Sequence, residues 1–568
     1  MAFQLSAGVL VSEIDLTTVI PSVATSTGAF VGPFAWGPAS EIITIPDEVS
    51  LVNRFGKPDS TNYEYWFSAA NFLAYGNNLK VVRAINTAAG GANNATANTG
   101  VGVIIKNSDE WLANQQGNAV GTNNGWAARY PGELGNSLKI SVADANSYSG
   151  WAYASQFTST PNTSSYVFNK SGLTSNDELH IVVVDANGAI SGTAGTVLEK
   201  YPFVSKASDA KDDSGNSSYY KNVIAQQSQY VHWLAHPATA NLNSGTAWGS
   251  SANATVFKTL TSNITFSFSG GSDGTTSTAN TVTGWDLFKN SEAVDVSLLV
   301  TGTGNSTVAT YVISNIAETR KDCVAFISPP KASVVNNPGS EAAAAVAFRN
   351  ALTSSSYAVI DSGYKYQYDK YADLYRWVPL NGDIAGLCAR TDAERDPWFS
   401  PGGLNRGVIK NVVKLAWNPT KTERDTLYVT GINPVVSFPG EGTVLFGDKT
   451  MLAKPSAFDR INVRRLFIVL EKAIARAARF SMFEFNDQFT RAQFVALVEP
   501  FLRDVQGRRG ITDFRVVCDD TNNTSQVIDS NQFIGDIYIK PARSINFIQL
   551  NFVAVRTGVS FNEVVGQF

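Results

Sequence analysis

Residues 270–274, GGSDG, match the G-x-S-x-G pattern of a serine nucleophile elbow. In that motif a helix follows the serine directly, exposes its hydroxyl and supplies an amide to the oxyanion. Here the next residues, TTSTANTVTG, favour no stable helix, and the possible bases His180, His232 and His236 have no recognisable catalytic context. We interpret the stretch as a glycine-rich turn, and a serine hydrolase that uses Ser272 is a remote alternative.

Two further patterns come close to metal and nucleotide sites. His232 and His236 are four residues apart, as zinc ligands on one helix face are, but no third ligand is evident and Pro237 would end the helix. Residues 442–450, GTVLFGDKT, resemble a phosphate-binding loop, but Asp448 spoils the spacing and would repel a phosphate. We therefore expect no catalytic residue, no metal and no cofactor.

A predicted helix over residues 461–479 carries the remaining cluster of functional side chains. Its apolar residues fall on one side of a 3.6-residue wheel. Four cations fall in a narrow arc opposite them: Arg465, Lys472, Arg476 and Arg479. Only Glu471 lies nearby along the helix to offset them. This basic front is either a solvated helix face or a surface for an acidic partner.

The elements after this helix predict a compact α+β core. A second helix begins near Thr490, which with Gln493 forms a Thr-x-x-Gln capping box, and stops around Gly507. Residues rich in β-branched and aromatic side chains then predict three strands, at 514–517, 535–539 and 545–555. The last strand continues into an uncapped tail, which suggests an element meant for another subunit.

Length and composition limit the possible classes of protein. A chain of 568 residues predicts three or four domains, and a formal charge of −4 argues against nucleic acid as a main partner. Cys323, Cys388 and Cys518 are far apart and predict buried thiols of a reducing cytoplasm. A basic signal region and a long apolar run are both missing, so we expect no membrane insertion.

The chain as a whole predicts a multidomain α+β fold. Apolar runs separated by helices favour an α/β domain, and the Asn-, Thr-, Ser- and Gly-rich stretch after Ala84 favours a β-rich insertion. Alternation in the first residues predicts a strand that either folds onto its own sheet or extends as an arm. The predicted parts are an N-terminal arm (1–22), the α/β domain (23–90 and 207–345), the inserted β-rich domain (91–206), a C-terminal α+β core (346–544) and a C-terminal strand and arm (545–568).

Short motifs near the C-terminus carry a resemblance to a known family. The run RINVRRL at 460–466, then FND at 485–487 and a helix led by Thr490, resembles the tail sheath proteins of contractile-tailed bacteriophages. VVCD at 516–519 and IKPA at 539–542 resemble the T-even-like branch. Further motifs occur in the same order over nearly the full length, with the weakest match at about 90–265.

The resemblance implies a structural protein rather than an enzyme. Such a subunit would polymerise with itself as hexameric rings around a tail tube protein, meet baseplate and tail terminator proteins, and contract to drive the tube through the host envelope. It would be made in the bacterial cytoplasm and become part of the virion. Sheaths of tailocins or of type VI-like secretion systems are the alternative.

The resemblance also assigns roles to particular residues. It implies that the chain ends pair with a neighbouring copy and so complete a C-terminal polymerisation domain, and that the basic front faces the tube. The residues implied in the arms are Val9, Val11, Glu13, Ile14, Phe547, Leu550, Phe552 and Val555. Those implied to face the tube are Arg465, Lys472, Arg476 and Arg479.

Overall fold

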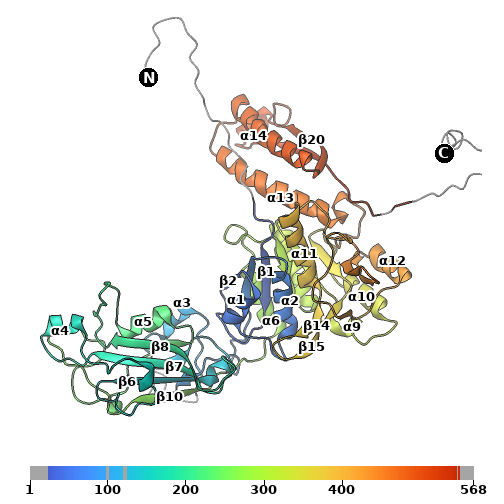
Figure 1. Cartoon of the computed structure of the whole chain (residues 1–568). Coiled ribbons are helices and arrows are strands. Elements are labelled where there is room, and N and C mark those ends of the chain that lie inside the picture. Colours follow the sequence, from blue (N-terminus) through green and yellow to red (C-terminus); the bar gives the residue numbers. More distant parts are fainter. Residues whose placement is uncertain (1–22, 98–100, 119–124, 547, 550–568) are drawn as a thin grey trace, which may run out of the picture. The chain divides into compact units, whose positions relative to one another are not determined.

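A computed structural model describes residues 23–97, 101–118, 125–546 and 548–549, with helices and strands labelled in Figure 1. The described chain divides into two compact units. The large unit lies within Pro21–Pro397 and Pro401–Ala477, and the small unit includes Trp398–Ser400 and the residues from Ala478 onward. The fold is mixed α/β with several separate sheets. All the residues implied in the arms lie outside the described residues.

A seven-stranded sheet forms the centre of the large unit, in the order β17-β13-β12-β11-β1-β3-β2. All neighbours are parallel except β2 and β3. The strands are β1 (Gly28–Gly32), β2 (Ile42–Ile45), β3 (Leu79–Arg83), β11 (Leu298–Val300), β12 (Val324–Ile327), β13 (Ala358–Asp361) and β17 (Ile432–Asn433). Apolar runs predicted β11, β12 and β13 correctly, because strands covered on both faces need such runs.

Helices cover both faces of this sheet. One core cluster joins the sheet to α1 (Glu48–Phe55), α2 (Tyr63–Leu73), α11 (Asn381–Glu394) and the first turns of α13 (Ile461–Ala478). The other joins it to α6 (Thr278–Asp286), α7 (Ser306–Val312), α10 (Glu341–Asn350) and α12 (Lys421–Val429). The prediction that TTSTANTVTG favours no stable helix is therefore wrong: α6 begins within this stretch, because Ser277 and Asn280 make a capping box.

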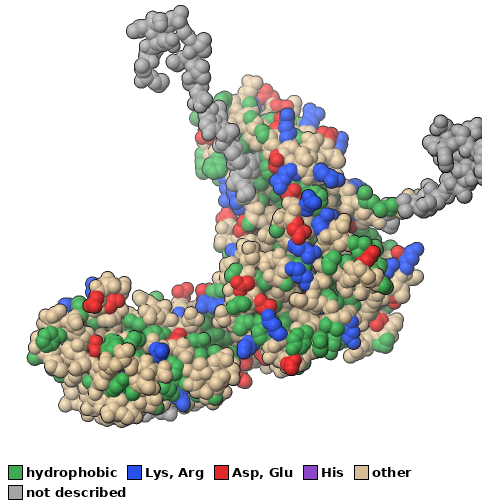
Figure 2. Space-filling view, in the orientation of Figure 1, with side chains coloured by type: hydrophobic (Ala, Val, Ile, Leu, Met, Phe, Trp, Pro, Cys, Tyr) green, Lys and Arg blue, Asp and Glu red, His purple; other side chains and the backbone are tan. Residues whose placement is uncertain are grey.

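A second seven-stranded sheet forms the inserted domain, where Figure 2 shows few charged side chains on the visible face. Its order is β8-β7-β6-β10-β4-β5-β9, and its pairings are antiparallel. The strands are β4 (Thr96–Ala97), β5 (Trp126–Ala128), β6 (Leu138–Asp144), β7 (Glu178–Asp185), β8 (Thr196–Ser205), β9 (Val231–Trp233) and β10 (Ile264–Ser269). The insertion thus extends beyond the predicted limit at 206. The pattern of residues 219–234 predicts one helix, but the structure forms α5 (Tyr220–Gln227) and then β9.

The predicted boundary at residue 346 also differs from the structure. Strands β13 and β17 hydrogen-bond into the central sheet, so the described chain stays in the large unit up to Ala477, apart from Trp398–Ser400. Main-chain pairing between distant segments decides this boundary, and no local sequence signal reveals it. Two small sheets complete the unit: β14 (Tyr364–Asp369), β15 (Leu374–Pro379) and β16 (Lys414–Leu415) form one, and β18 (Val435–Phe438) and β19 (Gly442–Leu445) the other.

The small unit packs α14 (Gln488–Gly507) on a hairpin of β20 (Ile511–Val517) and β21 (Asp536–Pro541). The predicted capping box is wrong, because the side chain of Asp487 is the N-cap and accepts the Thr490 N–H at 2.8 Å. Residues 545, 546, 548 and 549, within the third predicted strand, are not in a strand. Within the described residues, β20 and β21 pair only with each other, which leaves one edge of each strand open.

A buried ion pair in the inserted domain gives a stability prediction. Lys206 Nζ lies 2.8 Å from Asp144 Oδ2, and both side chains are fully buried. Because Asp144→Ala leaves the ammonium unpaired, we expect the opening free energy of β6 and β7 to fall by about 3–5 kcal/mol. Amide hydrogen exchange measures this change. The control Asp209→Ala breaks an exposed ion pair with Lys170 and should have a far smaller effect; equal effects would contradict the argument.

Candidate functional site

A buried ion pair fixes helix α13 to α11 within the large unit. Both Nη atoms of Arg465 contact the carboxylate of Asp392 on α11, at 2.7 and 2.6 Å. The two side chains are only 4% and 6% exposed. A bidentate guanidinium–carboxylate pair fixes orientation as well as distance, and breaking it would leave a charge without water or counterion. The pair therefore sets how α13 lies against α11.

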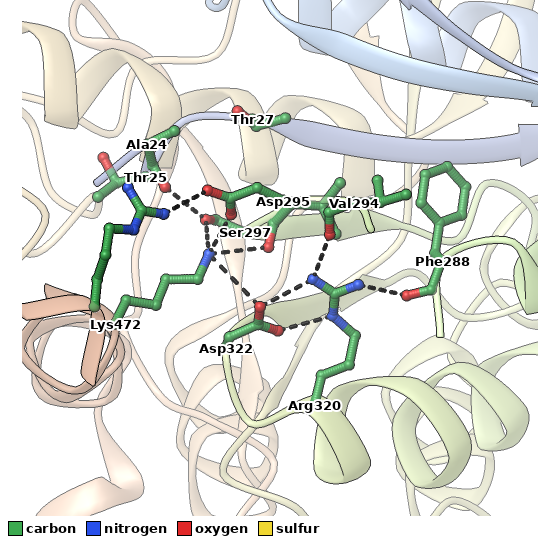
Figure 3. Close-up of polar contacts among 12 residues, drawn as sticks. Ala24, Thr25, Thr27, Phe288, Val294, Asp295, Ser297, Arg320, Asp322 and Lys472 are labelled. Atoms are coloured by element: carbon green, nitrogen blue, oxygen red, sulfur yellow. Dashed lines mark hydrogen bonds and ion pairs between the residues drawn. The ribbon is translucent and has the colours of Figure 1, made fainter. Parts of the chain in front are cut away.

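Lys472 links α13 to the segments that precede β11 and β12 (Figure 3). Its Nζ lies 2.8 Å from Asp295 Oδ1 and donates to Ser297 Oγ at 3.0 Å. It also lies 3.8 Å from Asp322 Oδ2. One turn further, Arg476 contacts Asp295 at 3.4 Å from a half-exposed position. Asp295 and Asp322 thus offset the charges of Lys472 and Arg476.

The same cluster holds the segment that leads into β1. Ser297 Oγ donates to Ala24 O at 3.0 Å, and Arg465 Nη2 reaches Thr25 O at 3.3 Å. Arg320 holds Asp322 in place, because its guanidinium donates hydrogen bonds to both carboxylate oxygens of Asp322, at 2.8 and 2.9 Å. Figure 3 shows Ala24, Ser297, Asp322 and Arg320 around Lys472. We call Asp295, Asp322, Asp392, Arg320, Arg465, Lys472 and Arg476 the α13 anchor.

Neighbouring charges favour the charged forms of Arg465 and Asp295. Burial alone lowers the pKa of Arg465, but the carboxylate of Asp392 outweighs burial and raises it. Burial likewise raises the pKa of Asp295, but Lys472 and Arg476 outweigh burial and hold it below the ordinary value. Burial raises the pKa of Cys388, beside Arg465, to about 12, so this thiol stays protonated. Cys323 and Cys518 are also free and buried, as expected.

The structure corrects the predicted basic front of α13. Arg465 and Lys472 point into the large unit rather than to solvent, because acidic groups from distant segments receive them. Only Arg476 and Arg479 of the four predicted residues are exposed, and Arg479 belongs to the small unit. The helical wheel placed the four cations on one stripe of α13 correctly. The predicted solvent exposure was wrong for Arg465 and Lys472.

Sequence reasoning missed the acidic half of the α13 anchor, although a signal was available. Asp295 and Asp322 precede β11 and β12, and Thr25 precedes β1. These three strands are parallel neighbours, so their amino ends meet at one edge of the sheet. Knowledge of the strand order would therefore have placed Thr25, Asp295 and Asp322 close together. Asp392 gives no comparable signal.

The other predicted sites do not assemble into catalytic groups. Ser272 Oγ donates to Gly91 O at 2.6 Å, and α6 begins only at Thr278. His232 stacks on Trp111, and burial lowers its pKa to about 3. The Nζ of Lys449 donates to a carbonyl oxygen, that of Tyr428, at 2.8 Å. These side chains serve packing and local hydrogen bonding.

The carboxyl edge of the central sheet, where α/β folds commonly hold ligands, is filled by protein. Ser328 donates to Asp361 at 2.7 Å, and the backbone N–H of Asn381, at the start of α11, donates to Ser328 at 3.0 Å. Burial raises the pKa of Asp361 to about 8. Across the described residues there is no group of three or more His, Cys, Asp or Glu that could hold a metal ion. No described helix is long and apolar enough to cross a membrane.

Three family models match this chain. They are the phage tail sheath protein central domain over residues 274–451, the phage tail sheath C-terminal domain over 453–554, and the tail sheath protein Gp18 domain III N-terminal region over 25–84. The tail sheath protein of Vibrio phage KVP40 is 34% identical over 99% of this chain and 100% of its own length. That of Enterobacteria phage T4 is 35% identical over 99% of each chain.

Solved structures show the same fold. The sheath tail protein Lin1278 from Listeria innocua superposes with a TM-score of 0.52 and 12% identity, over 92% of this chain and 96% of that one. The helical sheath of the anti-feeding prophage in its contracted state gives a TM-score of 0.51 and 13% identity, over 97% and 99% of the two chains.

The α13 anchor gives a second prediction. Because Asp392→Ala leaves the guanidinium of Arg465 buried and unpaired, we expect the opening free energy of α13 to fall by about 3–5 kcal/mol. Amide hydrogen exchange of α13 in the purified chain measures it. The matched change Arg476→Ala removes a half-exposed contact and should cost less than about 1 kcal/mol. If both variants exchange alike, the ion pair does not hold the helix.

Proposed function

The chain belongs to the phage tail sheath family, and from this premise we propose that it is the structural subunit of a contractile phage tail sheath. Near-full-length identity to phage tail sheath proteins carries the proposal, since both chains align from end to end. Copies of the chain stack as rings around a tail tube, and contraction drives the tube through the host envelope for genome ejection. The protein is then a virion component that also meets the baseplate and tail terminator.

Assembly itself supplies the mechanical work in this proposal. Contraction runs downhill from a metastable extended state as new contacts form between rings, and it consumes no nucleotide. The geometry around Lys449 supports this view, because its ammonium is engaged by a carbonyl oxygen rather than facing an open phosphate loop. Sheaths of tailocins or of type VI-like secretion systems would work by the same physics.

The chain ends link neighbouring copies in our proposal. Arms 1–22 and 545–568 add strands to a sheet edge of the next copy, and main-chain hydrogen bonds provide the affinity. The hairpin of β20 and β21 supports this, because a two-stranded sheet is marginal alone and both of its outer edges are open within the described residues. The C-terminal region becomes a polymerisation domain only in the assembly.

Of the four cations implied to face the tube, we keep this role only for the two exposed ones. We propose that Arg476 and Arg479 meet an acidic surface of the tube, while Arg465 and Lys472 hold α13 inside the subunit. Exposed contacts contribute roughly 0.2–1 kcal/mol each, which suits a surface that must hold and then release. The inserted domain projects outward from the tube.

Electron microscopy of the purified full chain tests the proposed function. We expect long tubes, because the subunit carries its own linking elements. Chains that remain monomeric at every concentration up to the solubility limit would count against it.

Deletion of residues 1–20 tests the arm model. We expect a folded and soluble protein that forms no tubes under conditions in which the full chain does. Sedimentation and electron microscopy measure polymer, and circular dichroism confirms the fold. Normal tubes from the shortened chain would refute strand exchange by the N-terminal arm.

Charge reversal tests the tube-facing role. The double change Arg476→Glu and Arg479→Glu should lower co-assembly with tail tubes several-fold, since two weak attractions become repulsions. Tube-free polymerisation should change less. The control, Lys200→Glu with Lys211→Glu, alters net charge equally at exposed positions of the inserted domain. Equal loss in both assays would assign the two arginines to contacts between sheath subunits.

A further inference from the structure

The small unit exposes a dense group of large apolar side chains between the end of α13 and the first turn of α14. Within residues 480–489, five such side chains are each at least 59% exposed: Phe480, Met482, Phe483, Phe485 and Phe489. We call residues 480–489 the aromatic segment. Aromatic side chains bury about 150–250 Å² each, so the group offers several hundred Å² of apolar surface. That area suits a protein partner rather than a small ligand.

The aromatic segment is held in place rather than left as a loose loop. Asn486 Nδ2 donates to Gln532 O at 2.8 Å and to Asn523 Oδ1 at 3.1 Å. Asp487, within the segment, caps α14. Phe483 has a φ of 70°, a conformation that costs energy for a residue with a side chain. The backbone is therefore fixed in a shape that directs phenylalanines away from the unit's own core.

A second exposed apolar surface lies in the large unit. The segment 404–413 runs beside β19, where Val408 bridges to Val444, and exposes Leu404, Val408 and Val413. We call residues 404–414 the basic strip. It borders an open cleft of about 340 Å³, whose lining is half apolar or aromatic and half polar: Phe67, Tyr368, Val412, Val413, Glu48, Gln367, Lys370 and Asn411. The cleft offers room for an inserted aromatic side chain.

The charges of the two surfaces are complementary. The aromatic segment contains Glu484 and Asp487 and no lysine or arginine. The basic strip contains Arg406, Lys410 and Lys414 and no acidic residue. Opposite charges around an apolar contact favour one pairing and one register. This match favours a second copy of the chain over an acidic tube surface as the partner of the aromatic segment.

We propose that the aromatic segment of one copy packs on the basic strip of a second copy. The proposal rests on the proposed function, because it adds a side-chain contact to a polymer of this chain. The two surfaces differ, so the contact is heterologous and repeats from copy to copy into a ring or an open helix. It acts separately from the chain ends, which link copies through main-chain hydrogen bonds.

Paired substitutions in the full chain test this packing. Phe483→Ser with Phe485→Ser should raise the critical concentration for tube formation at least about tenfold, because burial of two aromatic side chains is lost. The control, Phe168→Ser with Leu173→Ser, removes two exposed apolar side chains of the inserted domain and should polymerise as the wild type does. Thermal melts should show that both variants fold.

A charge exchange and a crosslink identify the partner surface. Glu484→Lys and Lys414→Glu should each weaken polymerisation, and a chain with both changes should recover. Phe485→Cys and Val413→Cys chains, mixed and oxidised as polymer, should give a disulfide-linked dimer that wild type lacks, since the three native cysteines are buried.

The outcomes separate this proposal from the proposed function. Wild-type tubes together with normal polymerisation of the Phe483 and Phe485 double variant would overturn the packing and leave the sheath function standing. So would a double variant that polymerises normally but fails to assemble on tail tubes, because the aromatic segment would then face the tube. A wild-type chain that forms no polymer would overturn both.

Discussion

The buried contact between Arg465 and Asp392 is the interaction on which the arrangement of the large unit around α13 depends. A buried ion pair adds little net stability, because both ions lose water. Removing either partner is costly, however, and the bidentate geometry accepts one orientation. The pair therefore specifies where α13 lies. Lys472 extends the same constraint to the amino ends of β1, β11 and β12, where the chain enters the sheet.

The two compact units differ in how much apolar surface and how many open strand edges they leave exposed. The large unit closes two core clusters over both faces of a seven-stranded sheet. The small unit has one long helix, one hairpin and a row of exposed phenylalanines. A chain that polymerises can leave such edges and apolar groups open, because neighbouring copies cover them. This contrast fits a subunit whose C-terminal region completes its fold in the assembly.

The elements that local sequence predicted well are those with strong local causes. Continuous apolar runs marked β11, β12 and β13. Predictions from weak local patterns were wrong where contacts with other residues decided the structure. Strand β9 follows α5 within a stretch that reads as one helix, because β5 pairs with it. Asp487 displaced the predicted cap of α14 because its carboxylate reaches the Thr490 amide.

The sequence by itself determined that cations line one stripe of α13, because helical spacing fixes which residues share a face. It also determined the family, because many short motifs occur in the same order along the chain. Only the tertiary structure decided that Arg465 and Lys472 turn inward. Their counterions, Asp392 and Asp295, come from segments far away in sequence, and the strand order that gathers them is set by long-range hydrogen bonding. Spacing along one helix carries no information about charges that fold onto it from elsewhere.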